Sequence, residues 1–220
     1  LGDVYKRQMS ISGTGSVTIA NTGPVTLAGA NTYSGGTTIN AGATLIAGSN
    51  SAIGTGVVIS AGSAANPATF ASTSSVVLPS LTITGGVTKI ASNVTTLGSQ
   101  SYADIMLAPT NSGTTNLTST NANISLLGKV DSVTDKTQSL SINAGTANII
   151  IGDSMGSVAR FNELTATANK IYVLADILTA QTQTFNGAIL IGDASYLGKT
   201  PTTGFLFQAH YIPYFQYHSG

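Results

Sequence analysis

Short runs of alternating apolar and polar residues fill most of this chain. From Ser16 onward, runs rich in Val, Ile and Thr are separated by Gly, Asn, Ser and Ala, as in SVTIA at 16–20 and ATLIA at 43–47. A period of two is the pattern of a strand with one buried face. Helical periodicity is scarcely visible, and only residues 161–168 resemble it. The pattern therefore predicts an all-β fold.

The sequence also repeats itself. A shift of 83 positions, without gaps, aligns residues 78–107 with residues 161–190. The shift places Leu81 on Leu164, Thr82 on Thr165, Thr84 on Thr167, Thr96 on Thr179, Gln100 on Gln183, Tyr102 on Phe185 and Leu107 on Leu190. A shorter echo relates NIIIGD at 148–153 to AILIGD at 188–193, forty residues later. These intervals are roughly four and two times 20 residues, the approximate length of one three-strand coil in a β-solenoid.

The composition fits such stacked coils. Only 7% of the residues are charged, and residues 8–88 contain no Asp, Glu, Lys or Arg. In a solenoid each outward position recurs about 4.8 Å above and below itself, so a column of like charges would repel. We expect inward Val, Ile and Leu to form the core, outward Thr, Ser and Asn to form polar rows, and Gly and Asn to form turns. Residues 9–200 then form one β-helix of about nine or ten coils, with about 20 residues per coil.

Charge and cysteine content narrow the possible partners. The formal net charge is zero, with no basic cluster, so we expect neither nucleic acid nor an anionic membrane as a partner. No apolar run of about 18 residues is present, and we expect no membrane-spanning helix. Cysteine is absent, which excludes disulfides and thiolate chemistry and suits a chain that crosses an oxidising periplasm unfolded.

Residues 23–62, GPVTLAGANTYSGGTTINAGATLIAGSNSAIGTGVVISAG, closely resemble the autotransporter passenger-associated repeat. We name the residues that carry this resemblance the passenger motif: Gly29, Asn31, Thr32, Tyr33, Ser34, Gly35, Gly36, Thr37, Ile39, Gly42, Leu45, Gly54 and Gly56. Downstream, QSLSINAG at 138–145 and QTFNGAILIGD at 183–193 are similar to repeats of filamentous-haemagglutinin-like exoproteins. Together these resemblances cover most of residues 12–195.

The resemblance implies a right-handed parallel β-helix in a secreted or surface-displayed bacterial passenger. It implies export by type V secretion and a structural role as the stalk of an adhesin. The implied partners are an unknown host or matrix ligand and an outer-membrane translocator, either a barrel domain or a partner transporter, outside this chain. The motif residues are implied to be structural, with no catalytic residue, cofactor or metal.

Two stretches depart from the repeat pattern. LGDVYKRQ at 1–8 holds three of the sixteen charges and resembles a translated sequencing adapter, so we expect the natural chain from residue 9 onward. Residues 201–220 hold six of the fourteen aromatic residues and both histidines, His210 and His218. We expect this stretch to be either an aromatic-rich tail or a truncated next coil.

The sequence gives only weak support for an enzymatic activity. GDASYLGKT at 192–200 resembles a phosphate-binding loop, but its spacing is one residue too long and no helix follows. The acids expected at a β-helix active site are spread over about ninety residues: Asp104, Asp131, Asp135, Asp153, Glu163, Asp176 and Asp193. Asp153 and Asp193 are equivalent in the shorter echo and fall two coils apart, which leaves calcium binding there open. We expect no enzyme.

Two binding hypotheses remain beside the stalk. Aromatic rings could stack on sugars if Tyr33, Tyr102, Tyr172 and Phe185 align outward, although Tyr102 and Phe185 could equally stack inside. A carbohydrate-active or carbohydrate-binding β-helix module is therefore the alternative function. Thr-x-Thr occurs at 82–84 and 165–167, a pattern seen on ice-binding faces, but two copies are too few to form one.

Overall fold

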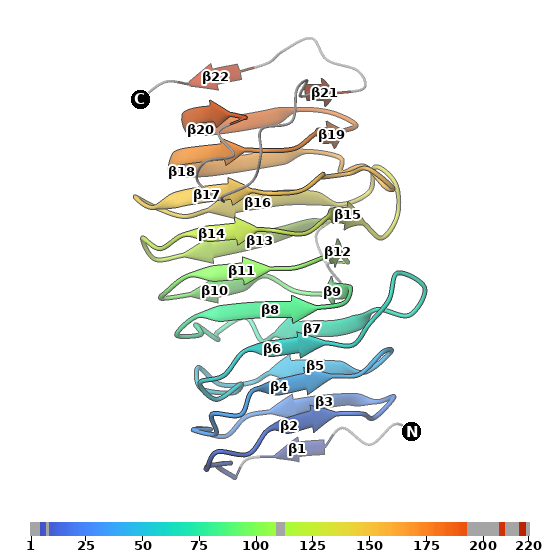
Figure 1. The fold of residues 1–220 in the computed structure, drawn as a ribbon, viewed down its shortest axis with the longest axis vertical. Helices are drawn as coiled ribbons and strands as arrows, with labels where there is room; N and C mark the ends of the chain where they lie inside the picture. The colour runs from blue at the N-terminus through green and yellow to red at the C-terminus, as the bar shows by residue number, and fades with distance from the viewer. Residues whose placement is uncertain (1–4, 8, 109–112, 193–206, 210–215, 219–220) are drawn as a thin grey trace.

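Every regular element in the described part of the chain is a β-strand, and every strand pairs in parallel with strands about one coil away. The structure is a computed structural model that describes residues 5–7, 9–108, 113–192, 207–209 and 216–218, with side chains described for 9–108 and 113–192. The strands nearest the viewer in Figure 1 run left to right as the chain climbs from the N-terminus, so the coil is right-handed. The predicted parallel β-helix is confirmed.

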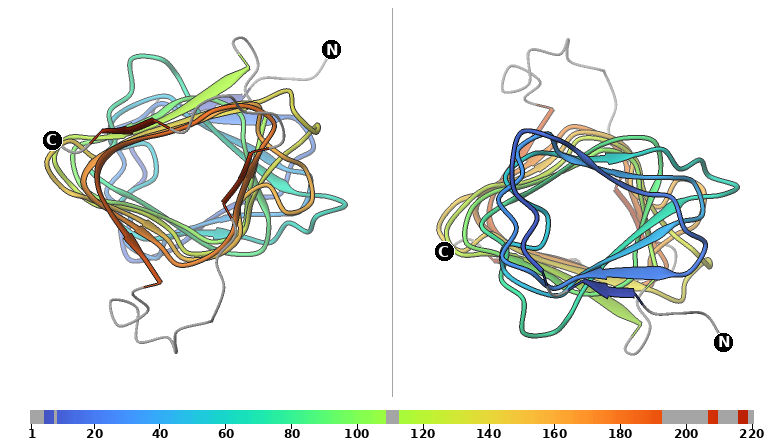
Figure 2. Two further views of the ribbon diagram at one scale, coloured as in Figure 1. Left: turned by 90° about the horizontal axis from the view of Figure 1, so that it is seen from above. Right: turned by 90° about the horizontal axis from the view of Figure 1, so that it is seen from below.

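The strands line three faces of the coil, which we name A, B and C. Face A contains β1 (Tyr5–Arg7), β3 (Pro24–Leu27), β5 (Thr44–Ala47), β7 (Ala68–Ser72), β9 (Thr88–Ile90), β12 (Ile105–Leu107) and β15 (Val130–Ser132). A bridge through Met155 extends this face to β19 (Ile177–Thr179), which pairs with β21 (Phe207–Ala209). Viewed along the axis, successive coils follow one closed outline (Figure 2).

Faces B and C are joined at the last coils by two long strands that turn a corner. Face B contains β2 (Val17–Ile19), β4 (Thr37–Ile39), β6 (Val58–Ser60), β8 (Leu81–Gly85), β11 (Gln100–Tyr102), β14 (Ile124–Leu126) and β17 (Asn148–Ile151). Face C contains β10 (Val94–Thr96), β13 (Thr114–Ser119) and β16 (Ser139–Asn143), and β22 (Gln216–His218) pairs at its end. β18 (Leu164–Val173) and β20 (Gln183–Ile191) start on face C and finish on face B.

The coils are longer and fewer than the sequence predicted. They average about 22 residues over about 8 turns, against the expected 20 residues and nine or ten turns. Face A shows the variation directly, because Val25 pairs with Leu45, Leu45 with Phe70, and Ile90 with Leu107. The face A strands from β3 to β12 are all 3–5 residues long, so the extra residues lie in the turns between them.

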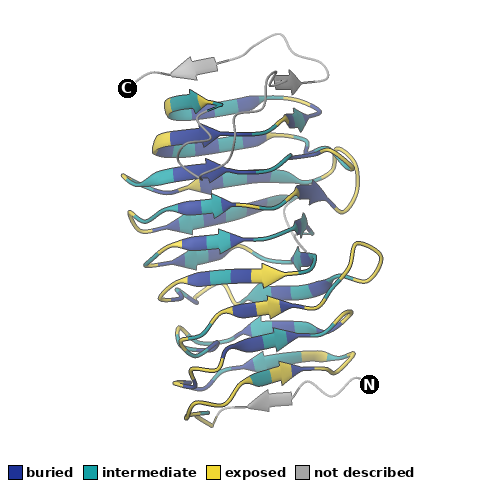
Figure 3. Cartoon of the chain, viewed as in Figure 1, coloured by how far each residue is buried: buried dark blue, intermediate teal, exposed yellow. Residues whose placement is uncertain are grey.

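Inward side chains form continuous columns through the molecule. On face B the column runs through Val58, Ile83, Tyr102, Leu126 and Ile151, each 0–1% exposed and each paired with the next in register. Figure 3 shows the resulting alternation of buried and more exposed positions along the strands. A fully buried side chain of this size contributes about 1.5–3 kcal/mol, so each coil depends on the neighbour that covers it.

Both copies of the 83-residue repeat form the same kind of corner between two strands, but the two corners join different faces of the coil. Leu78 bridges to Thr96 in the first copy, and the equivalent Phe161 bridges to Thr179 in the second. The first corner leads from face C to face B, whereas the second leads from face A to face C. The shift therefore spans three coils and two further faces, slightly less than the rough estimate of four coils. The forty-residue echo is two coils, as expected.

Removing one inward side chain should destabilise the fold far more than removing its outward neighbour. Leu45 is 0% exposed between Val25 and Phe70, whereas the adjacent Ile46 on β5 points outward. We expect Leu45→Ala to lower the free energy of unfolding by about 2–5 kcal/mol. Ile46→Ala, the matched control, should cost clearly less, and chemical denaturation of both variants measures the difference. Equal losses would contradict the inward column.

Candidate functional site

The passenger motif forms a ladder of turns at the edge of the first coils. Asn31 is 3% exposed and ties three successive coils together, because its Oδ1 accepts from the Ile11 amide (2.9 Å) and its Nδ2 donates to the Ala52 carbonyl (2.6 Å). Its neighbours continue the ladder through the backbone, with Thr32 N donating to Ile11 O (2.9 Å) and Ser34 N to Gly13 O (3.0 Å). This part of the motif therefore fixes one coil onto the next.

The aromatic and apolar motif residues point into the core. Tyr33 is 1% exposed, and its hydroxyl lies 2.6 Å from the Thr37 hydroxyl, which is also buried. Burial raises the pKa of Tyr33, and the hydrogen bond with Thr37 opposes that rise. Ile39 and Leu45 are fully buried in the two following strands. None of these side chains is presented to a ligand.

The motif glycines lie where neighbouring coils approach too closely for a side chain. A Cβ on Gly35 would lie 2.6 Å from the Gly15 carbonyl carbon, and one on Gly56 would lie 2.5 Å from Gly36 N. Gly36, Gly42 and Gly54 also have positive φ, at 84°, 74° and 62°. Gly29 is closed off in the same way by the Met9 backbone. The glycine positions are thus explained by stacking.

A second buried polar cluster, which we name the glutamine corner, lies at both copies of the 83-residue repeat. In the first copy Gln100 Nε2 donates to Thr118 O (2.7 Å) and Thr96 Oγ1 (3.2 Å), and its Oε1 accepts from the Tyr102 hydroxyl (2.7 Å). In the second copy Gln183 Nε2 donates to Thr179 Oγ1 (3.2 Å). Sequence reasoning aligned these residues but did not assign them this role.

Some of the carboxylates join adjacent coils, and those in the described residues do not gather into one site. Asp104 accepts from the Lys129 amide (2.8 Å) and Asp131 from the Val158 amide (2.8 Å), each reaching the next coil. Asp153 accepts from the amide of the following residue, Ser154 (2.7 Å). Within the described ranges no three acidic or histidine side chains lie close enough to hold a metal ion. Glu163 and Asp176, which are also described, belong to no such group.

On the surface, Asp135 forms ion pairs with Arg160 and, at 3.9 Å, with Lys136. Asp135 accepts from the Arg160 amide (2.8 Å) and from its guanidinium Nε (3.3 Å) and Nη2 (3.2 Å). The hydrogen bonds from Arg160 hold the pKa of Asp135 below its usual range. Because both side chains are partly exposed, solvent screens the pair and its contribution to stability is small.

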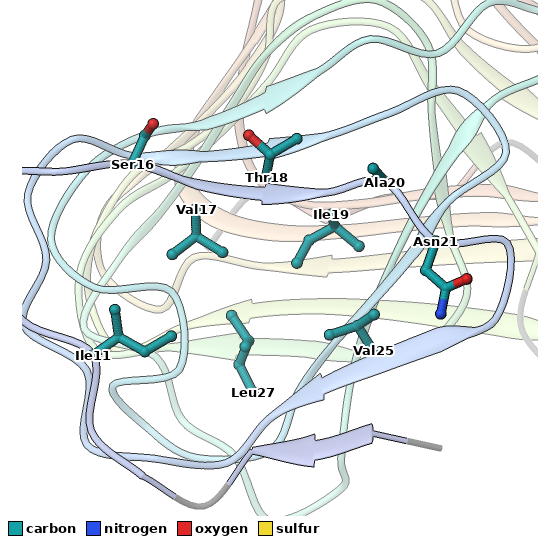
Figure 4. Close-up of a pocket in the computed structure, with 9 residues that line it drawn as sticks. All are labelled: Ile11, Ser16, Val17, Thr18, Ile19, Ala20, Asn21, Val25 and Leu27. Atoms are coloured by element: carbon teal, nitrogen blue, oxygen red, sulfur yellow. The ribbon is translucent and has the colours of Figure 1, made fainter. Parts of the chain in front are cut away.

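The hollow that opens at the N-terminal end of the stack has a volume of about 510 Å³. Its walls come from the first coil, with Ile11, Val17, Ile19, Val25 and Leu27 pointing inward (Figure 4). None of its nine lining residues is aromatic or titratable. The hollow is therefore the end of the apolar column and contains no groups for acid–base chemistry.

The rings considered for sugar stacking do not form an outward row. Tyr33, Tyr102 and Phe185 are 0–1% exposed and belong to the interior. Tyr172 lies on the outer side of face B but is 8% exposed, packed with Ile150 and Leu174. The outward row that the sugar-stacking hypothesis requires is therefore not formed by these four residues, and the interior alternative holds for Tyr102 and Phe185.

Several predicted positions lie outside the described residues. These are Asp193, nearly all of the loop at 192–200, His210 and most of the stretch 201–220; His218 is described only through the backbone of β22. No helix in the described residues is long and apolar enough to span a membrane. The chain matches no protein-family model, no curated protein and no solved structure. The resemblance to passenger repeats therefore stays a prediction from the sequence.

Close stacking of the motif glycines predicts a sharp positional effect. Gly35→Ala would place a methyl group against the Gly15 backbone, so we expect a loss of about 1–3 kcal/mol in unfolding free energy. Gly15→Ala, one coil earlier, would meet nothing within 4 Å and should be nearly neutral. Thermal melting of the two variants tests this difference. A neutral Gly35→Ala would exclude the close approach of these turns.

Burial of Tyr102 predicts a loss of stability at alkaline pH. Burial raises the pKa of Tyr102 above 10.0, so above about pH 10 the unfolded state loses this proton while the folded state keeps it. Stability is then lost as pH rises, by up to about 1.4 kcal/mol per pH unit.

The variant Tyr102→Phe isolates this effect. At neutral pH it should cost about 1–3 kcal/mol, because Gln100 Oε1 loses its buried donor. Above about pH 10 its unfolding free energy should fall less steeply than that of the wild type. Urea denaturation at a series of pH values measures both effects, and identical slopes would show that Tyr102 titrates normally.

Proposed function

We propose that this chain is a rigid β-helical stalk segment of a secreted or surface-displayed bacterial adhesin of the autotransporter passenger kind. The observation that supports this proposal is the structural role of the passenger motif. Asn31, Tyr33 and the motif glycines all serve to stack one coil on the next. The residues that resemble a passenger repeat are therefore those that make the rod.

The dimensions support a spacer role. About 8 turns at about 4.8 Å per turn give a rod of roughly 40 Å, and each added coil would extend it by the same step. Side-chain bonds join successive coils along this length, from Asn31 at one end through Asp104 to Asp131. Such repeated bonds make the rod stiff, so that it holds its two ends at a fixed distance from each other.

The partners proposed for this stalk lie outside the chain. They are an outer-membrane translocator, either a barrel domain or a partner transporter, and a host or matrix ligand. A cysteine-free chain with 7% charged residues suits passage in an unfolded state followed by coil-by-coil folding at the cell surface. We propose no contact with nucleic acid and no insertion into the membrane.

No observation favours the carbohydrate-active alternative. The carboxylates of Asp104 and Asp131 bond backbone amides in separate turns, and the rings suggested for sugar stacking are buried. We therefore propose a structural and adhesive role without catalysis.

Surface display tests the stalk directly. The chain is placed between an outer-membrane translocator and an N-terminal nanobody, and a flexible Gly/Ser linker of equal length serves as control. We expect both proteins to reach the surface, and only the solenoid to leave the nanobody protected from trypsin cleavage at the connection. Retention in the periplasm, or cleavage as fast as in the flexible control, would refute the stalk. Saturable binding of a soluble glycan by the chain alone would favour the alternative.

A further inference from the structure

The outer side of face C carries two rows of uncharged polar side chains. One row runs through five coils in unbroken parallel register: Thr95, Thr118, Asn143, Thr167 and Asn186. Two residues earlier on each strand, a second row runs through four coils: Asn116, Ser141, Thr165 and Thr184. The apolar residues between them, such as Leu117 and Ile142, point into the core. The result is a regular two-row array.

The array is open to solvent. All nine side chains are exposed or half-buried. Within the described residues, the hydroxyls of Thr118, Thr165 and Thr184 form no hydrogen bond with the protein, and Asn186 Nδ2 donates along its row to Thr167 Oγ1 (3.2 Å). Because threonine is β-branched, its χ1 angle is restricted and its hydroxyl is held in few positions. The hydroxyls of the five threonines in the array are thus restricted to few positions before anything binds.

The other two faces lack this uniformity. On face A the corresponding outward row contains Lys89, Met106 and Asp131 in successive coils. On face B it changes from Ser125 to Ile150 and then to Tyr172. Of the three faces, only face C therefore keeps small, neutral side chains in these outward rows, from β10 through β20.

The spacing of the array indicates what it could recognise. Its polar groups repeat at about 4.8 Å from coil to coil and at about 6.7 Å between the two rows. Tetrahedrally bonded water, with hydrogen bonds of about 2.75 Å, places second-neighbour oxygen atoms about 4.5 Å apart and repeats about every 7.3 Å across two layers. Both spacings agree to within about a tenth, over a length of about 19 Å on face C.

We propose that face C binds the surface of ice. The array lies on the outer surface of a sheet, whereas a small soluble ligand needs a concave site. A polysaccharide would be expected to stack on aromatic rings, and the two rows contain none. An ordered water lattice needs only matched, preset hydroxyl and amide groups beside the threonine methyl groups. The inference does not depend on the stalk function.

Partition of the full chain into slowly growing ice tests the proposal. The wild type should enter polycrystalline ice at least several-fold more than a non-binding protein of similar size and should inhibit ice recrystallisation. The variant Thr118→Tyr/Thr165→Tyr replaces two hydroxyls at the centre of the array with bulky rings and should lose both effects. Tyrosine is favourable in strands, so folding should survive, and circular dichroism with thermal melting verifies this. Thr38→Tyr, an outward position on β4 of face B, is the matched control and should behave like the wild type.

Three outcomes would overturn the proposal. The wild type could be excluded from ice as fully as the non-binding protein. The face C variant could enter ice as well as the wild type. Finally, the wild type could be excluded from ice yet bind powdered cellulose or chitin in a way that the face C variant loses, which would assign the array to a polysaccharide.

Discussion

Parallel backbone pairing between successive coils is the constraint on which the whole molecule depends. Thr37 N donates to Val57 O in the next coil (2.9 Å), and Val17 N donates to Gly36 O (3.0 Å), and the same step recurs to the last described strands. No coil satisfies its own backbone, so each needs a neighbour at about 4.8 Å. Every side chain then lies directly over the side chain at the equivalent position of the next coil. The residues therefore act as columns that run along the axis of the solenoid.

Columns impose different demands inside the coil, at its corners and outside. Inside, Ile83, Tyr102 and Leu126 stack because only apolar surface is compatible with a core without water. At the corners the chain must turn while remaining buried, so polar groups such as Asn31 and Gln100 bond the backbone of the adjacent coils. Outside, a repeated charge would face its own copy, which explains why small neutral residues predominate.

These demands leave the outer faces as the places where function can differ. The core and corners determine the shape of the coil, and the same register that builds a rod also builds a periodic outer surface. A stalk and an ordered binding face are therefore compatible products of one geometry. The outward positions of faces A and B contain residues of mixed character, including Lys89 and Tyr172. On face C, nine outward positions in register contain neutral polar residues.

The sequence by itself determined the strands, the parallel solenoid and the inward role of most Val, Ile and Leu, because alternation and repetition are properties of the chain alone. The tertiary structure decided what lies above what. Coil lengths vary with the turns, so neither the 83-residue shift nor the inward placement of Phe185 and Tyr33 could be read from spacing. For the same reason the two Thr-x-Thr segments, at 82–84 and at 165–167, lie on different faces. The segments that lie beside 165–167 on face C contain Asn and Ser as well as Thr, and they are 116–118, 141–143 and 184–186. The register of two strands depends on the lengths of all the turns between them, and these lengths are known only from the folded structure.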